Sequence, residues 1–249
     1  MRPQISIITV VYNGKELLEK TINSIVSQSS SNYEYLIIDG GSTDGTLDII
    51  KKYSDKINYW ISEKDKGIYD AMNKGIEAAK GEYILFLNAG DELYAPDVLK
   101  TIFSKSPEAD IFYGETVLTD DEKELGTRSE LSIRKLPENL TWKSLSKGMV
   151  VCHQSFIVRK ELIPFYDMQY KLSSDIDWVI KCLKNSKNTV NTHLIISKYL
   201  IGGYSVKNIR KSWTERFIIL KKHFGLLSTL CNHFYIALRF FIRKGNKKY

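Results

Sequence analysis

The chain has 249 residues, of which 43% are hydrophobic and 26% are charged. This composition is typical of a globular protein and excludes a disordered one, and the length allows one large α/β domain or two small ones. The formal net charge of +7 indicates an anionic partner without choosing among nucleotide, nucleic acid and membrane. Cys152, Cys182 and Cys231 lie far apart, which argues against a zinc site or disulfide framework and favours a reducing compartment.

The N-terminal residues 1–4 lead directly into an apolar run and lack the pattern of a signal peptide. No uninterrupted apolar run reaches the roughly 20 residues that a membrane-spanning helix needs. We therefore expect a cytoplasmic protein.

Strands and helices are predicted to alternate over the first half of the chain. Short β-branched or aromatic runs predict strands, and apolar residues spaced by three or four predict helices between them. This alternation predicts βαβ units and an α/β fold, with a Rossmann-like, mostly parallel sheet flanked by helices. The predicted strands are 5–11, 35–38, 58–62 and 83–87, and the predicted helices lie within 17–26, 47–53 and 68–79.

Polar residues follow these strands. Because the carboxyl ends of parallel strands meet at the edge where α/β sheets bind ligands, we expect the polar residues to converge there. Neither the Gly-x-Gly-x-x-Gly motif nor the phosphate-loop motif is present. The residues that follow the four strands are Tyr12 and Asn13, then Asp39, then Asp65, and finally Asn88, Ala89, Gly90 and Asp91.

Asp91 ends the loop 88–91, which directly follows the strand at 83–87, and this strand reads as buried on both faces. A carboxylate in this position predicts a site for a divalent metal, Mn²⁺ or Mg²⁺, which would in turn hold a diphosphate. The alternative is that Asp91 serves only as a turn or helix-cap residue.

The second half of the chain is less regular. Further strands are predicted at 111–115 and around Val151 and 156–158, whereas 128–147 shows no periodicity and is predicted to be a mobile loop. An apolar helix follows Asp175 and Asp177. Asp175 is either a functional carboxylate or a cap of that helix.

The C-terminal residues predict two basic amphipathic helices. A basic, aromatic-rich helix favours binding to an anionic membrane surface, so we expect the protein at the inner face of the cell membrane. The alternatives are packing against the rest of the chain or a dimer interface, and the oligomeric state stays open. No nucleic-acid-binding motif is present. The apolar faces are Ile209, Trp213, Phe217, Leu220 and Phe224 in the first helix, and Leu227, Leu230, Phe234, Leu238 and Phe241 in the second.

Four ordered stretches resemble the family-2 inverting glycosyltransferases of the GT-A fold, of the type found in bacterial polysaccharide and lipopolysaccharide biosynthesis. A weaker similarity continues to Ser205. The resemblance implies a catalytic domain at 1–205, with a nucleotide-sugar-binding half at 1–110 and an acceptor half at 111–205, followed by the helical tail at 206–249. The matching stretches are 6–13, 38–46, 63–75 and 86–91, with 153–155, 174–175 and 202–205 as the weaker ones.

The resemblance also implies a role for each matching residue of the donor half. The Asp-x-Asp metal motif of the family is degenerate here, because Gly90 precedes Asp91 and Asn88 replaces another frequent acid. Asp91 would bind the metal. Thr9, Tyr12 and Asn13 would line the nucleotide pocket through side chain or backbone. Asp39 would bind the base or ribose, Asp65 would bind the base, and Asn73 would support the Asp65 loop. Asn88, Ala89 and Gly90 would contact the nucleotide-sugar.

Asp175 matches the catalytic base of the family, and Asp177 is its nearest competitor. His153 would contact the metal or diphosphate, unless it is a packed core histidine. These roles imply inverting, metal-dependent transfer of one sugar from a nucleotide-sugar, with a UDP-sugar favoured, to a glycan or lipid-linked saccharide. The absence of a Gln-x-x-Arg-Trp motif favours single-sugar addition.

The sequence leaves two other functions open. A sugar-phosphate nucleotidylyltransferase would need a loop rich in Gly and Arg after the first strand, and residues 13–15 do not supply one. A catalytically inactive nucleotide-sugar-binding module is conceivable because Gly90 weakens the metal motif.

Overall fold

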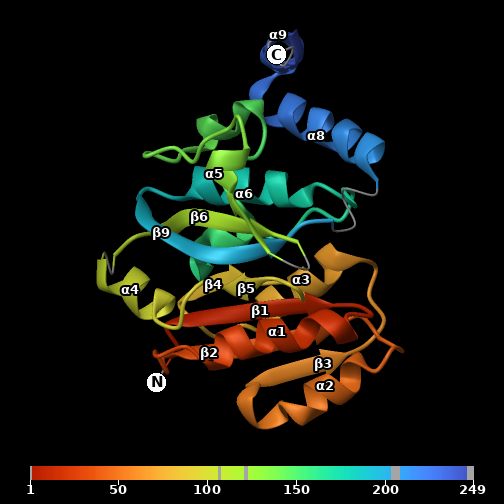
Figure 1. Ribbon diagram of the computed structural model, residues 1–249, viewed down its shortest axis with the longest axis vertical. Coiled ribbons are helices and arrows are strands. Elements are labelled where there is room, and N and C mark those ends of the chain that lie inside the picture. Colours follow the sequence, from red (N-terminus) through yellow and green to blue (C-terminus); the bar gives the residue numbers. More distant parts are fainter. Residues whose placement is uncertain (1, 106–107, 121–122, 203–207, 246–249) are drawn as a thin grey trace.

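The computed structural model describes residues 2–105, 108–120, 123–202 and 208–245. Within these ranges the chain forms a nine-stranded mixed sheet with helices packed on both faces (Figure 1). The strands are β1 (Ile5–Val11), β2 (Tyr33–Asp39), β3 (Tyr59–Ser62), β4 (Tyr83–Phe86), β5 (Glu92–Leu93), β6 (Ile111–Thr119), β7 (Glu124–Thr127), β8 (Phe156–Arg159) and β9 (Thr189–Leu200). Their order is β3-β2-β1-β4-β8-β6-β9-β5, with β7 paired to β6.

The first four strands confirm the predicted parallel arrangement. β1 pairs in parallel with β2 and β4, and β2 pairs in parallel with β3. Every residue of β1 and β4 is buried, as expected for strands that are covered on both faces. The carboxyl ends of β1 and β4 therefore lie side by side, which brings Tyr12 close to the loop 88–91.

The remaining strands make the sheet mixed. β8 runs antiparallel to β4 and β6, whereas β9 runs parallel to β6 and antiparallel to β5. The sequence indicated β6 and β8 but not β5, β7 or β9. β9 has no regular apolar alternation, because its register against β6 shifts twice, between Tyr113 and Thr116. The prediction of a strand at Val151 is wrong, since this residue lies in a bend.

The helices divide between the two faces of the sheet. On one face of the sheet, α1, α2 and α4 pack through the buried side chains of Leu18, Ile50 and Leu99. On the other face, α3 and α6 pack through Met72 and Val179. The α-helices are α1 (Lys15–Val26), α2 (Thr46–Lys52), α3 (Ile68–Ala78), α4 (Val98–Lys105), α5 (Arg128–Leu131), α6 (Ser174–Asn185), α8 (Ile209–Phe224) and α9 (Leu226–Gly245), and two of the 3-10 helices are η2 (Trp142–Lys147) and η3 (His153–Ser155).

The prediction of a mobile loop at 128–147 is wrong. The segment contains α5 and η2, and the side chains of Leu140 and Leu145 are fully buried in the core. Their apolar contacts come from distant parts of the chain, so no local periodicity announces them.

The two tail helices differ from each other. α8 packs on the rest of the fold through the buried Ile219 and Leu220, and Phe224 stacks on Trp142 with ring centroids 5.4 Å apart. Trp213 of the same helix is 63% exposed, so the residues predicted for one apolar face include both buried and exposed side chains.

Figure 1 shows α9 at the end of the molecule, beyond α8. This helix leaves Leu227 80% exposed and Phe234 72% exposed. Within the described ranges, none of the helices combines the length and apolar character that a membrane crossing requires. The side chains of Ile209, Leu238 and Phe241 and the residues 203–205 of the weaker resemblance lie outside the described part, as does the domain boundary at 205.

Gly81, which precedes β4, lies directly against β1. A Cβ atom on Gly81 would come within 2.5 Å of the backbone nitrogen of Ser6 and 2.7 Å of the carbonyl carbon of Ile5. The Gly81 N–H also donates a hydrogen bond to the hydroxyl of Ser6 at 2.8 Å. Glycine at this position therefore allows β1 and β4 to pair at their normal spacing.

We expect Gly81→Ala to lower the free energy of unfolding by about 2–3 kcal/mol, because the added methyl group meets backbone atoms that cannot move aside. Urea denaturation measures the loss. Lys80→Ala, an exposed neighbour, is the control and should stay within about 0.5 kcal/mol of wild type. A Gly81→Ala protein as stable as wild type would contradict this account of the β1–β4 pairing.

Candidate functional site

A cavity of about 890 Å³ lies at the carboxyl ends of β1 and β4. Tyr12 and Asp91 from the first half of the chain and His153 and Asp175 from the second half all line it, and α8 contributes Arg216. Residues that are up to about 200 positions apart in the sequence therefore share one site. The structure thus brings Asp91, the predicted metal residue, and Asp175, the predicted base, to the same cavity.

Asp91 is deeply buried, with 4% of its surface exposed. Its carboxylate accepts hydrogen bonds from the side-chain amide of Gln154 at 2.9 Å and from the backbone N–H of Leu200 at 3.3 Å. Burial raises the pKa of Asp91 to about 7, against the opposing effect of these two hydrogen bonds. A cation beside this carboxylate would favour its charged form.

Thr21 of α1 holds the loop that carries Asp91. Its hydroxyl donates to the carbonyl oxygen of Asp91 at 2.7 Å and accepts from the N–H of Gly90 at 2.9 Å. Gly90 has a φ of 99°, and a Cβ atom there would lie 3.2 Å from Leu200. An acidic side chain at position 90 would therefore be strained in this backbone conformation.

Asn88 and His153 lie beside Asp91 in the cavity wall. The Oδ1 atom of Asn88 is buried and has no hydrogen-bond partner among the described residues, and its amide nitrogen lies 3.4 Å from Nε2 of His153. Burial lowers the pKa of His153, against the opposing charge of Asp175. The imidazole is therefore neutral near pH 7 and has a free lone pair to offer to the amide or to a metal.

These groups fit a hard divalent cation. A carboxylate and an amide oxygen are ligands that Mg²⁺ and Mn²⁺ accept, and the unpartnered oxygen of Asn88 lacks the donor that a buried acceptor requires. The described residues contain no group of three or more His, Cys, Asp or Glu side chains placed to hold a metal. Substrate phosphates and water would therefore have to complete the coordination.

Asp175 occupies the first turn of α6 and lines the cavity. Tyr69 is another lining residue, and burial, followed by the charge of Asp175, raises its pKa. The Ser174 hydroxyl donates to the carbonyl oxygen of Asp167 at 3.0 Å. This hydrogen bond ties the first residue of α6 to the preceding segment.

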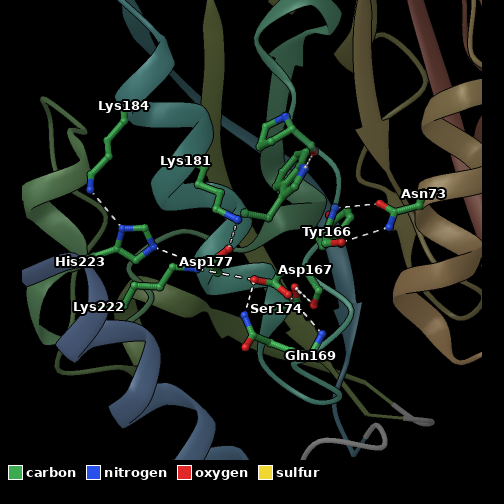
Figure 2. Close-up of polar contacts among 12 residues, drawn as sticks. Asn73, Tyr166, Asp167, Gln169, Ser174, Asp177, Lys181, Lys184, Lys222 and His223 are labelled. Atoms are coloured by element: carbon green, nitrogen blue, oxygen red, sulfur yellow. Dashed lines mark hydrogen bonds and ion pairs between the residues drawn. The ribbon is translucent and has the colours of Figure 1, made fainter.

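Asp177, the competing candidate for the base, does not line the cavity. Figure 2 shows its carboxylate among residues of α6 and α8, where it pairs with Lys181 at 2.5 Å, His223 at 2.8 Å and Lys222 at 3.4 Å. Burial alone would raise the pKa of Asp177, but the hydrogen bonds from His223 and Lys181 hold it well below its usual range. Asp177 therefore ties α6 to α8, and this arrangement favours Asp175 as the base.

Glu215 makes a second link from α8 to the region of Asp175. Its two carboxylate oxygens accept hydrogen bonds at 2.8–2.9 Å from the backbone N–H groups of Lys171, Leu172 and Ser173. Three N–H groups of the segment that precedes α6 thus have their partner on the tail helix. The first tail helix is consequently part of the site.

Two residues predicted to contact the nucleotide have no exposed surface. The hydroxyl of Thr9 donates to the carbonyl oxygen of Leu87 at 2.7 Å and accepts from the hydroxyl of Tyr35 at 3.1 Å. The carboxylate of Asp39 accepts hydrogen bonds from backbone N–H groups of its own loop at 3.0–3.1 Å and from the Ser62 hydroxyl at 2.6 Å. Both side chains brace the loops around the site in this structure instead of facing the cavity.

The remaining donor-side residues lie at the cavity mouth or next to it. Tyr12 is 66% exposed and lines the cavity. The side chain of Asn13 accepts a hydrogen bond from the N–H of Thr43 at 2.9 Å and so joins two loops. A Cβ atom on Gly40 would meet both Tyr12 and Asp65, which shows that these two side chains share one niche.

The resemblance implied that Asn73 supports the Asp65 loop, but its side-chain hydrogen bonds join it to Tyr166. Figure 2 shows it facing Tyr166, whose backbone N–H and carbonyl oxygen pair with its side-chain amide at 2.7 Å and 3.1 Å. Asn73 therefore joins α3 to the segment that leads to Asp175. The aromatic ring of Tyr166 stacks between Tyr69 and Trp178, with ring centroids 5.3 Å and 5.0 Å away.

Sequence reasoning missed several residues of the site. They come from several elements and share no motif, and a buried polar residue such as Thr21 gives no local signal. The resemblance includes Gln154 in its stretch 153–155 but implies no role for it. The missed residues are Thr21, Arg128, Arg134, Gln154, Tyr199, Leu200, Glu215 and Arg216.

The raised pKa of Asp91 predicts that its charge destabilises the metal-free fold. Between the usual Asp pKa of about 3.9 and the folded value of about 7, the folded state binds the additional proton, so stability falls as pH rises through this range. In Asp91→Asn the amide of Gln154 can turn to keep its hydrogen bond. We expect its stability advantage over wild type to grow from pH 4 and to level off above pH 7 at on the order of 3 kcal/mol. Urea unfolding in EDTA from pH 5 to pH 8 measures it, and a difference independent of pH would contradict the raised pKa.

The contacts of Asp177 and Asp175 predict opposite sensitivities. We expect Asp177→Asn to lose about 3 kcal/mol of unfolding free energy, because a buried ion pair loses one partner, with a smaller share from the partly exposed Lys222. Asp175→Asn should stay within about 0.5 kcal/mol of wild type. Chemical denaturation of both variants measures the two values, and equal losses would show that Asp177 does not tie α6 to α8.

Comparisons with known proteins show the family and the fold of the chain. The profile of the family described as glycosyl transferase family 2 matches residues 6–163, which is more than half of the chain. A PGL/p-HBAD biosynthesis glycosyltransferase of Mycobacterium bovis is 29% identical over 225 residues, with 86% of this chain and 84% of the relative covered. The putative teichuronic acid biosynthesis glycosyltransferase TuaG of Bacillus subtilis is 27% identical over 242 residues, with 92% and 93% covered.

Solved structures show the same fold. S. aureus TarS, residues 1–349, matches with a TM-score of 0.68 at 19% identity, covering 93% of this chain and 72% of that one. The mannosyltransferase PcManGT of Pyrobaculum calidifontis, determined with GDP-Man and Mn²⁺, matches with a TM-score of 0.64 at 16% identity, covering 96% and 76%. The chain therefore belongs to glycosyl transferase family 2, has the GT-A fold, and is a glycosyltransferase that acts on a nucleotide-sugar donor.

Proposed function

We propose that this enzyme transfers a single sugar, with inversion and with the help of a divalent metal, from a UDP-sugar to a glycan or lipid-linked saccharide. One observation carries the proposal: Asp91 and Asp175, from the two halves of the chain, line the same cavity. A single displacement at the anomeric carbon requires stabilisation of the leaving diphosphate and a base for the acceptor hydroxyl. These two carboxylates supply both functions.

Asp91 is the metal-binding carboxylate in this proposal, with Asn88 Oδ1 and His153 as the neighbouring donors. Bound Mn²⁺ or Mg²⁺ would act as a Lewis acid that offsets the charge of the departing diphosphate. The buried, unpartnered oxygen of Asn88 and the raised pKa of Asp91 both favour a cation at this place. The Mn²⁺ in the structure of PcManGT supports a metal in this fold.

Asp175 is the base that removes the proton of the acceptor hydroxyl as that hydroxyl attacks. The hydroxyl of Ser174 and the carboxylate of Glu215 hold the backbone on the N-terminal side of Asp175. A fixed base needs little reorganisation at the moment of reaction, which is how positioning contributes to rate.

The donor nucleotide is proposed to lie between the niche of Tyr12 and Asp65 and the loop 88–91, within the donor half at 1–110. The acceptor would enter from the half at 111–205. TarS has been solved with UDP and with UDP-GlcNAc, which favours a UDP-sugar. The nucleotidylyltransferase and the inactive module lose support, because the chain belongs to a glycosyltransferase family.

The acceptor is proposed to be an intermediate of a cell-envelope polysaccharide or glycolipid, as the names of the relatives suggest. The exposed Leu227, Leu230 and Phe234 of α9 suit a helix that lies on an anionic membrane surface. The enzyme is proposed to lie at the inner face of the membrane, where a lipid-linked acceptor would be within reach.

Calorimetry with UDP, GDP, CDP and dTDP, each with and without Mn²⁺, tests the donor and the metal. We expect UDP to bind most tightly, to require Mn²⁺, and to lose at least tenfold in affinity in Asp91→Ala. Asp175→Asn should bind UDP and Mn²⁺ within twofold of wild type, yet lose at least a hundredfold in kcat, because only the proton transfer is removed.

Turnover is followed as UDP release from a UDP-sugar, and NMR of the product shows whether the anomeric centre inverts. Asp177→Asn serves as the matched control at the same helix and should retain more kcat than Asp175→Asn. Nucleotide binding that is indifferent to Mn²⁺ and to Asp91 would overturn the metal assignment.

A further inference from the structure

Three arginines line the same cavity as Asp91 and Asp175. Arg128 begins α5, Arg134 follows it in the same segment, and Arg216 lies on α8. None of the three forms an ion pair with a carboxylate of the residues that the structure describes. Most other cationic groups in the structure are either exposed or paired, so this concentration of positive charge needs an explanation.

Arg128 is held rigidly, but its charge is not neutralised. Its guanidinium donates to three backbone carbonyl oxygens, those of Met149 at 2.5 Å, Val150 at 2.7 Å and Arg134 at 3.1 Å. Carbonyl groups satisfy its N–H donors without supplying a negative charge. The side chain is therefore fixed at the cavity wall as a cation.

Arg134 lies close enough to be affected by the charges of the other two. Burial, followed by the charges of Arg128 and Arg216, lowers the pKa of Arg134. Gly148 makes room for this side chain, since a Cβ atom on Gly148 would lie 3.0 Å from Nη1 of Arg134. The fold thus places a third guanidinium where two others already repel it.

Arg216 has a buried hydrogen-bond donor without an acceptor among the described residues. Its Nε atom is buried and has no partner among the described residues. A buried N–H without an acceptor costs free energy, and so does the repulsion among three cations. One bound anion with several acceptor oxygens would remove both costs.

A phosphoryl group is the anion that suits this cluster. Guanidinium groups present paired N–H donors that match the oxygens of a phosphate, and arginine stays charged in partly buried sites. The proposed metal at Asp91 already serves the diphosphate of the donor. The arginines belong instead to segments outside residues 1–110, and Arg216 neighbours Glu215, which holds the segment before Asp175.

We propose that Arg128, Arg134 and Arg216 bind a phosphoryl group of the acceptor, so that this enzyme acts on an acceptor carrying a phosphate or diphosphate. This inference rests on the proposed function, because it assigns the acceptor of that reaction. α8 continues into α9, whose apolar side chains are exposed. A phosphoryl group bound by the three arginines would join a saccharide in the cavity to a lipid carrier at the exposed side chains of α9.

Calorimetric titration with inorganic pyrophosphate in EDTA tests the cluster without metal or nucleotide. The full-length wild type is compared with Arg134→Gln, Arg216→Gln and the control Arg210→Gln, an exposed residue of α8 that loses the same charge. We expect the Kd for pyrophosphate to rise at least tenfold in Arg134→Gln and Arg216→Gln and less than twofold in Arg210→Gln. Circular dichroism melts confirm that each variant is folded.

A second titration, with UDP and Mn²⁺, separates the two possible sources of the phosphoryl group. We expect the Kd for UDP to stay within twofold of wild type in all three variants. A parallel loss of UDP affinity would assign the cluster to the donor diphosphate and overturn the proposal. Failure of wild type to bind pyrophosphate, or equal weakening in Arg210→Gln, would overturn it as well.

The two proposals fail in different ways. If wild type binds no nucleotide with Mn²⁺, the proposed donor chemistry fails while the pyrophosphate titration still reports on the arginines. If nucleotide binding behaves as expected and the arginine variants bind pyrophosphate like wild type, only the acceptor assignment is wrong.

Discussion

The parallel pairing of β1 with β2 and β4 is the constraint on which the rest of the site depends. Strands buried on both faces can satisfy their backbone groups only with neighbouring strands, so their carboxyl ends must emerge together at one edge. Gly81 permits this spacing between β1 and β4. The loops at that edge are then joined by short polar links, from Asn13 to Thr43 and from Thr21 to Asp91, which shape the donor side of the site from within the protein.

Two groups of ionisable side chains in the cavity have no partner of opposite charge among the described residues. Asp91 is a buried acid with neutral hydrogen-bond partners, and Arg128, Arg134 and Arg216 have no carboxylate partner among the described residues. Each arrangement costs stability in the free protein. Dipoles and charges that are held before the substrate arrives need little reorganisation during the reaction, and a metal with its diphosphate and a phosphorylated acceptor would neutralise the two groups together.

The contacts of α8 make the first helix of the C-terminal segment part of the folded domain. Asp177 and Glu215 connect this helix to α6 and to the segment before it, and Arg216 extends it into the cavity. The helix therefore packs on the GT-A domain, which is the alternative that the sequence had left open beside membrane binding. α9 leaves apolar residues exposed, as expected for the membrane-binding helix that the sequence predicts.

The sequence by itself determined the α/β class, the four parallel strands and the convergence of Tyr12, Asn88 and Asp91, because these follow from local apolar patterns and from the rule that parallel strands share an edge. It also placed Asp175 at the start of a helix. Only the tertiary structure decided that Asp175, and not Asp177, lines the cavity and that Asn73 faces Tyr166. It also decided that the side chains of Thr9 and Asp39 are buried and that three arginines line one cavity. These outcomes depend on which distant backbone or charge a side chain meets, and no local pattern encodes a partner that lies about 90 residues away, as Tyr166 does from Asn73.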